Sequence, residues 1–112
     1  MEELINRITS ATGIDAGTAQ KAVGLMLGFL RQEGSGNTAD ELIAAVPGAD
    51  AIVTEPMGGG IMGLGTQLMG MGLGMGEIQG LAKETIGFAR EKGGADKVDA
   101  LVNSIPGLNQ FV

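Results

Sequence analysis

The chain contains no cysteine, histidine, tryptophan or tyrosine, and its three aromatic residues are all phenylalanine. Without cysteine it has no disulfide, no thiolate nucleophile and no thiolate metal ligand. Without histidine as well, the common zinc sites and the Ser-His-Asp and Cys-His catalytic sites are excluded by inventory. Aromatic platforms for stacking nucleobases are missing too. Only carboxylates, lysines and hydroxyls remain for catalysis, and the sequence therefore predicts neither an enzyme nor a resident cofactor.

Positive charge is also scarce. Seven basic side chains face thirteen acidic ones, for a net charge of −6. An acidic protein repels phosphate backbones and anionic headgroups, so we expect no nucleic-acid partner. Residues 1–7 are acidic and then amphipathic, without the basic flank and apolar core of a secretory signal. This pattern predicts a cytoplasmic protein.

An internal repeat is the most informative feature that is present. Residues 16–53 match residues 75–112 without a gap, and we call this alignment the repeat register. Apolar character is kept at most of the positions that differ, as at Leu27 and Ile86. The identical pairs are Gly17 and Gly76, Gln20 and Gln79, Gly28 and Gly87, Phe29 and Phe88, Arg31 and Arg90, Gly34 and Gly93, Asp40 and Asp99, Leu42 and Leu101, Pro47 and Pro106, Gly48 and Gly107, and Val53 and Val112. A repeated unit of this kind buries its apolar face against its copy, so we expect one domain spanning residues 1–112.

Helical periodicity defines the elements within each unit. Apolar residues recur every three or four positions in residues 4–11, in a long helix that Asp15 caps and Gly34 ends, and in a helix that stops at Pro47. The second unit repeats the order, with a helix over about 77–92 and another through Ile105. No useful stretch alternates with period two, so strands are not expected.

These patterns predict an all-α, compact helical bundle of two pseudo-twofold-related helical repeats. Repeat 1 covers about residues 1–53, and the core of repeat 2 covers residues 75–112. We expect Phe29 and Phe88 in the core, and the short apolar tails 51–53 and 110–112 as lids on their own units.

The segment between the units, residues 56–76, has no charged residue and consists largely of glycine, methionine and leucine. The repeat register makes it overlap the first helix of repeat 2, which we expect to be buried at the centre of the bundle. If its apolar side chains are exposed instead, they form an interface with another protein or with a second copy, as a homodimer. The candidate interface residues are Met57, Ile61, Met62, Leu64, Leu68, Met69, Met71, Leu73 and Met75.

Other interpretations of the same segment remain open. Its length suits a membrane span, and it could also insert in lipid or line a pocket for a small apolar ligand. Residues 58–63 match the G-x-G-x-x-G nucleotide-binding pattern, but no strand context accompanies the match. Closely spaced methionines are typical of Cu(I) sites, although core packing by methionine is the favoured interpretation.

Two repeated charges are candidates for a symmetric binding site. Arg31 recurs as Arg90, and Asp40 recurs as Asp99. Each aspartate lies at the start of a predicted helix, where the helix dipole favours a negative charge. Each arginine lies near the end of one, where the dipole favours a positive charge. Helix capping and ion pairs are therefore the simpler interpretation.

Two resemblances rest on specific residues. The first thirty residues resemble the helical hairpin of histone-like bacterial DNA-binding proteins, on the pattern of Leu4, Ile5, Gly13, Ala19, Ala22 and Val23. The DNA activity of that family does not carry over, because this chain has no β-arm and no basic surface. Residues 41–50, followed by the glycine-rich middle and a second helical half, are similar to small bacterial all-helical families of unknown function. That resemblance implies a bacterial all-α protein without an assigned activity, and it supplies no catalytic residues.

Overall fold

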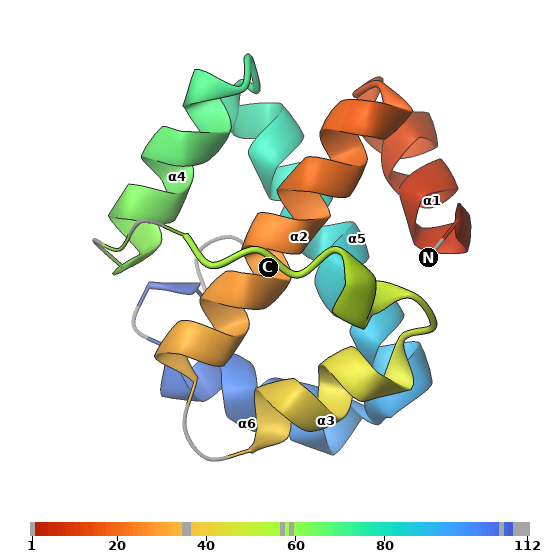
Figure 1. Cartoon of the computed structure of the whole chain (residues 1–112), viewed down its shortest axis with the longest axis vertical. Helices are drawn as coiled ribbons and strands as arrows, with labels where there is room; N and C mark the ends of the chain where they lie inside the picture. The colour runs from red at the N-terminus through yellow and green to blue at the C-terminus, as the bar shows by residue number, and fades with distance from the viewer. Residues whose placement is uncertain (1, 35–36, 57, 59, 106, 109–112) are drawn as a thin grey trace.

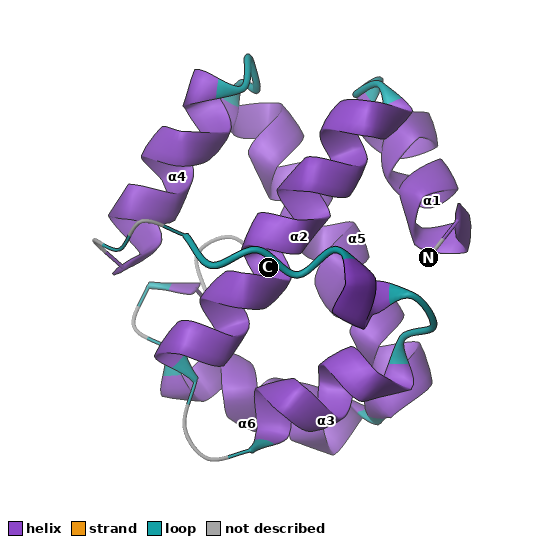
Figure 2. Ribbon diagram, viewed as in Figure 1, coloured by secondary structure: helices purple, strands orange, loops and turns teal. Residues whose placement is uncertain are grey.

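Helices account for nearly all the regular structure in the computed structural model, which describes residues 2–34, 37–56, 58, 60–105 and 107–108. The elements are α1 (Glu2–Thr12), α2 (Ala16–Glu33), α3 (Thr38–Ala45), the 3-10 turn η1 (Ala49–Ala51), α4 (Gly60–Gly70), α5 (Met75–Gly93) and α6 (Ala95–Ser104) (Figure 1). No strand occurs within these described ranges (Figure 2). The radius of gyration of 12.3 Å is that of a compact globule. The prediction of a compact all-α fold is confirmed.

The two long helices, α2 and α5, pack against each other at the centre. Every residue of α2 from Ala22 to Leu30 is buried, because α1, α3, α4 and α5 all contact this helix. Phe29 and Phe88 are 0% and 2% exposed, as expected for the core of each half. In Figure 1, α1 and α4 stand on opposite sides of the α2–α5 pair.

One face of α2 is lined by glycine so that the chain can cross it. The extended segment after η1 passes over this face (Figure 1), where the backbone N–H of Thr54 donates to the carbonyl of Gly24 at 3.0 Å. A Cβ at Gly24 would overlap the carbonyl oxygen of Ile52, and one at Gly28 would overlap that of Thr54. Side chains at these two positions would therefore push the crossing segment away. The tail 51–53 lies in this region, whereas the tail 110–112 falls outside the described residues.

We call residues 2–56 the first half of the chain and residues 58–108 the second half. The helices of the two halves correspond closely in the repeat register. The bounds of α1, α2 and α3 fall near those of α4, α5 and α6. The turns correspond as well, with left-handed backbone at Gly13 (φ 78°) and its match Gly72 (φ 91°), and at Gly48 (φ 84°) and Gly107 (φ 86°). Only glycine adopts this conformation without strain, which explains why glycine occupies all four positions.

The two halves exchange contacts. Helix α1 packs on α5 as well as on α2, and α4 packs on α2 as well as on α5. At the ends of the long helices, a Cβ on Gly34 would overlap the side chain of Leu101, and a Cβ on Gly93 would overlap that of Leu42. These two contacts match each other in the repeat register. Each half therefore contributes a leucine that fills the space above a glycine of the other half.

The expectation that the segment 56–76 is buried at the centre of the bundle is wrong. Helix α4 has 11 residues and lies at one edge of the bundle in Figure 1, where only one of its faces packs on α2 and α5. Leu64 and Leu68 are buried on that face, while Met62 and Met69 are exposed. Among the helices of the described ranges, none combines the length and the apolar character that crossing a bilayer requires.

Candidate interaction site

The inner face of α4 anchors this helix to the bundle. Leu64 and Leu68, one helical turn apart, are 1% and 0% exposed. The space beneath them is a cavity of about 10 Å³ that Met26, Ile61, Gly65, Ile78 and Leu108 also line. Pockets that bind small molecules measure roughly 300–1,000 Å³, so this cavity is too small for a ligand. The two leucines hold α4 in place and leave its opposite face free to contact something else.

The outer face of α4 consists of Met62, Thr66 and Met69, which follow one another at helical spacing. Met62 is 77% exposed and Met69 is 49% exposed. The hydroxyl of Thr66 donates to the carbonyl of Met62 at 3.0 Å, so its proton is engaged within the helix. No charge lies in residues 56–76. This face is therefore apolar, uncharged and exposed.

The structure divides the predicted interface residues into two groups. Exposed or partly exposed side chains belong to Ile61, Met62, Met69, Met71 and Met75, while those of Leu64, Leu68 and Leu73 are buried and Met57 falls outside the described residues. The buried leucines anchor the segment, because they cannot reach a partner without unfolding. The sequence pattern alone did not separate these two groups.

Helix α1 provides an internal comparison for α4. In the repeat register, Glu3 of α1 matches Met62 and Ser10 matches Met69. Both α1 residues are exposed, as their counterparts on α4 are. The same position on the same kind of helix is thus polar in one half and apolar in the other. Comparing the two helices position by position therefore identifies the exposed apolar face of α4 from the sequence, which composition alone does not.

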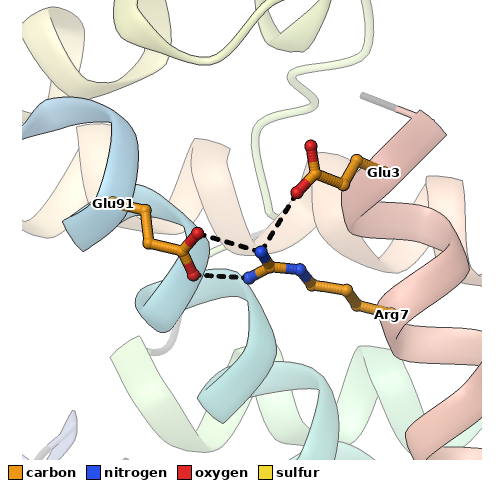
Figure 3. Close-up of polar contacts among 3 residues, drawn as sticks. All are labelled: Glu3, Arg7 and Glu91. Atoms are coloured by element: carbon orange, nitrogen blue, oxygen red, sulfur yellow. Dashed lines mark hydrogen bonds and ion pairs between the residues drawn. The ribbon is translucent and has the colours of Figure 1, made fainter.

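The polar face of α1 carries an ion-pair cluster around Arg7, drawn in Figure 3. Its guanidinium donates to both carboxylate oxygens of Glu91 on α5, at 2.6 and 2.9 Å, and to Glu3 at 3.0 Å. It also lies 5.1 Å from the centroid of the Phe88 ring, and Lys92 approaches the same ring at 5.4 Å. These contacts tie α1 to α5 across the boundary between the two halves.

The charges of this cluster stabilise one another. The hydrogen bond from Arg7, and then the positive charges of Arg7 and Lys92, lower the pKa of the Glu91 carboxyl below its ordinary value of 4.5. The hydrogen bond to Glu91 in turn raises the pKa of Arg7 further above its ordinary value. Among the described residues, Arg7 contacts Glu3 of its own helix and Glu91 and Phe88 of α5, so the cluster links α1 to α5. Within the described ranges, no three acidic side chains gather closely enough to hold a metal ion.

The repeated arginines make different contacts in the two halves. Arg31 pairs with Glu55 of the crossing segment at 2.6 Å, whereas Arg90 pairs with Asp99 of α6 at 2.7 Å. Asp40, the counterpart of Asp99, lies in the first turn of α3. The identical residues therefore form non-equivalent surface ion pairs, which typically contribute little to stability.

Comparisons of the chain with protein-family models, with curated proteins and with solved structures found no match.

Proposed function

We propose that this protein is a non-enzymatic, cytoplasmic assembly module, built from two pseudo-twofold-related helical repeats, that associates with a second copy of itself through the outer face of α4. The observation that carries the proposal is the exposure of Met62 and Met69 on an uncharged helix face. Methionine is flexible and polarizable, and it is over-represented on protein surfaces that bind partners.

The comparison with α1 supports a role for this face beyond folding. If the fold required apolar residues at these positions, Glu3 and Ser10 could not occupy them in α1. Large exposed apolar side chains without a folding role are a feature of interaction surfaces.

Charge supports a second copy as the partner. The chain carries a net charge of −6, so two copies repel each other overall. The outer face of α4 carries no charge, so a contact through it brings no two like charges of this face together. A twofold contact joins the same patch on both copies, and a short apolar helix face is complementary to itself in this way.

The exchanged contacts support the repeat architecture within each copy. Gly34 faces Leu101, and Gly93 faces Leu42. The repeat register turns each of these contacts into the other. A pseudo-twofold axis between α2 and α5 would relate them. The core of such a bundle is complete within one copy, and the outer face of α4 is one place where the halves differ.

The size of the face sets the expected affinity. Two methionines and a threonine from each copy bury on the order of a few hundred Å², below the roughly 1,200 Å² of stable interfaces. We therefore expect a reversible homodimer with a dissociation constant of about 1 µM or weaker. Such a dimer forms and separates as the protein concentration changes.

Light scattering after size exclusion, over a range of protein concentrations, tests the proposal. We expect the native mass to rise from monomer to dimer with concentration, with or without mild detergent. The double substitution Met62→Glu and Met69→Ser, which gives α4 the residues of α1, should keep the protein monomeric with unchanged helical circular dichroism. Gln79→Glu adds the same charge at an exposed position of α5 and should still dimerise.

Two results would contradict the proposal. A native protein that stays monomeric up to about millimolar concentration, where even weak contacts populate, has no self-association. Recovery of the protein with floating liposomes, lost in the double variant, would assign the same face to lipid instead.

A further inference from the structure

The thioethers of methionine are the most easily oxidised groups that this chain offers, because cysteine is absent. Their exposure differs widely within the described residues. Met62 is 77% exposed and Met69 and Met75 are each 49% exposed, whereas Met26 in the core is 2% exposed. An oxidant dissolved in water reaches an exposed sulfur directly and a buried one only after local opening. Among the described methionines, oxidation should therefore begin on and beside α4.

The fold should tolerate polar groups at the two α4 positions. Glu3 and Ser10 occupy the matching positions of α1, where both are exposed. A sulfoxide oxygen on Met62 or Met69 would project into water in the same way. The buried leucines that anchor α4 carry no sulfur and stay unchanged. Oxidation at these sites therefore alters the surface of the protein and leaves its core intact.

From this geometry we infer that Met62 and Met69 form an oxidation-sensitive contact surface, on which sulfoxide formation by a peroxide releases the second copy. The inference rests on the proposed self-association and adds its regulation. In the reaction, a sulfur lone pair attacks a peroxide oxygen, the O–O bond breaks and an S–O bond forms. With hydrogen peroxide the remaining oxygen leaves as water, so sulfur loses two electrons and the peroxide gains them.

The chemistry of the outer face explains why the contact would be lost. A sulfoxide oxygen accepts hydrogen bonds, and burying it without a donor is unfavourable. The Thr66 hydroxyl between the two methionines already donates to the carbonyl of Met62. The face carries no charged donor, because residues 56–76 have no basic side chain. We expect each sulfoxide to weaken association by about 10- to 100-fold.

Association of two copies should also slow the oxidation of Met62 and Met69, just as their oxidation weakens association. The contact covers the sulfurs of both residues in the dimer, so the peroxide reacts with them in the monomer. Raising the protein concentration should therefore slow oxidation of Met62 and Met69, while Met26 serves as a reference that the contact does not touch.

The test treats the whole protein with hydrogen peroxide. Peptide mass spectrometry follows each methionine, while light scattering follows the mass and circular dichroism follows the helices. We expect Met62 and Met69 to oxidise well before Met26, the dimer to become monomer and the helical signal to persist. Methionine sulfoxide reductases of both stereospecificities should restore the dimer. The double variant Met62→Leu and Met69→Leu keeps the apolar face and should remain dimeric in peroxide.

The outcomes separate this inference from the proposed function. If the dimer persists after both methionines are oxidised, the inference is wrong and the self-association stands. If the Leu variant also dissociates in peroxide, or if oxidation at these two sites unfolds the protein, the inference is wrong as well. If the untreated protein never dimerises, the proposed function fails and the inference fails with it.

Discussion

Replacing Gly28 by alanine should destabilise the protein, whereas the same replacement at its counterpart Gly87 should not. A Cβ at Gly28 would overlap the carbonyl oxygen of Thr54 and lie 2.6 Å from its carbonyl carbon and 3.2 Å from the Cα of Glu55. These are backbone atoms, which cannot rotate away as a side chain can. A Cβ at Gly87 meets no atom of the described residues within 4 Å. The two positions occupy the same place in two long helices and differ in the described residues that surround them.

The magnitude follows from three contributions. Alanine is better than glycine in a helix by about 1 kcal/mol, and both variants gain this amount. At Gly28 the extra methyl must displace the crossing segment, which costs about 1–3 kcal/mol for overpacking and about 1 kcal/mol for the lost hydrogen bond from Thr54 to Gly24. The free energy of unfolding should therefore fall by about 1–3 kcal/mol in Gly28→Ala and rise by up to about 1 kcal/mol in Gly87→Ala.

Urea denaturation followed by circular dichroism measures both values. The comparison is made at one protein concentration, because self-association adds to apparent stability. If the free energy of unfolding falls with urea concentration at the same slope in each variant, the variants expose the same surface area on unfolding. Gly24→Ala, which would overlap the carbonyl oxygen of Ile52, should behave like Gly28→Ala. If Gly28→Ala proves as stable as Gly87→Ala, the crossing segment does not lie on α2 and the reasoning is refuted.

Three further predictions concern the core and the α1–α5 contact. Phe29→Ala and Phe88→Ala should each lower the free energy of unfolding by about 3–5 kcal/mol, and a loss below about 1 kcal/mol at both would contradict the core assignment. Thr85 is 2% exposed and its hydroxyl has no hydrogen-bond partner among the described residues, so Thr85→Val should raise stability by about 1 kcal/mol in the same denaturation assay. The lowered pKa of Glu91 means that its carboxylate stabilises the fold above the unfolded-state pKa and that this contribution disappears as the pH falls through the folded-state value. Wild type should therefore exceed Glu91→Gln in stability at neutral pH and lose this advantage in acid; an equal advantage at both pH values would show that the ion pair with Arg7 is not its source.

Local signals in the sequence were enough for the positions of the helices and for the start of α2. The predicted cap Asp15 accepts a hydrogen bond from the backbone N–H of Thr18 at 2.9 Å, and Gly13 before it takes the left-handed conformation expected after the first helix. The helix predicted over about 77–92 is found as α5 (Met75–Gly93). These features depend on neighbours within a few residues, which is why periodicity and capping rules find them.

Tertiary contacts decided what the sequence left open. By helix propensity alone, Gly24 and Gly28 lower the stability of α2. Their role becomes clear only from the backbone segment that crosses the helix at these two positions. Arg31 pairs with Glu55 of that same crossing segment, which no periodicity relates to it. The burial of α4 was predicted wrongly for a similar reason. Leucine and methionine both occur along it and both are common core residues, so only the position of α2 and α5 shows which of them point inward.

The repeat register supplies part of the missing information, because it pairs positions of two helices whose burial can be compared residue by residue. Leu64 and its counterpart Ile5 are both buried, so this position requires an apolar side chain in either half. Met62 and Glu3 are both exposed and differ completely in polarity, so the fold accepts either one. We infer that a position which the fold leaves open, and which one half fills with an exposed apolar side chain, serves a contact outside the monomer. By this argument the outer face of α4 is the part of the surface where a partner contact should be sought first.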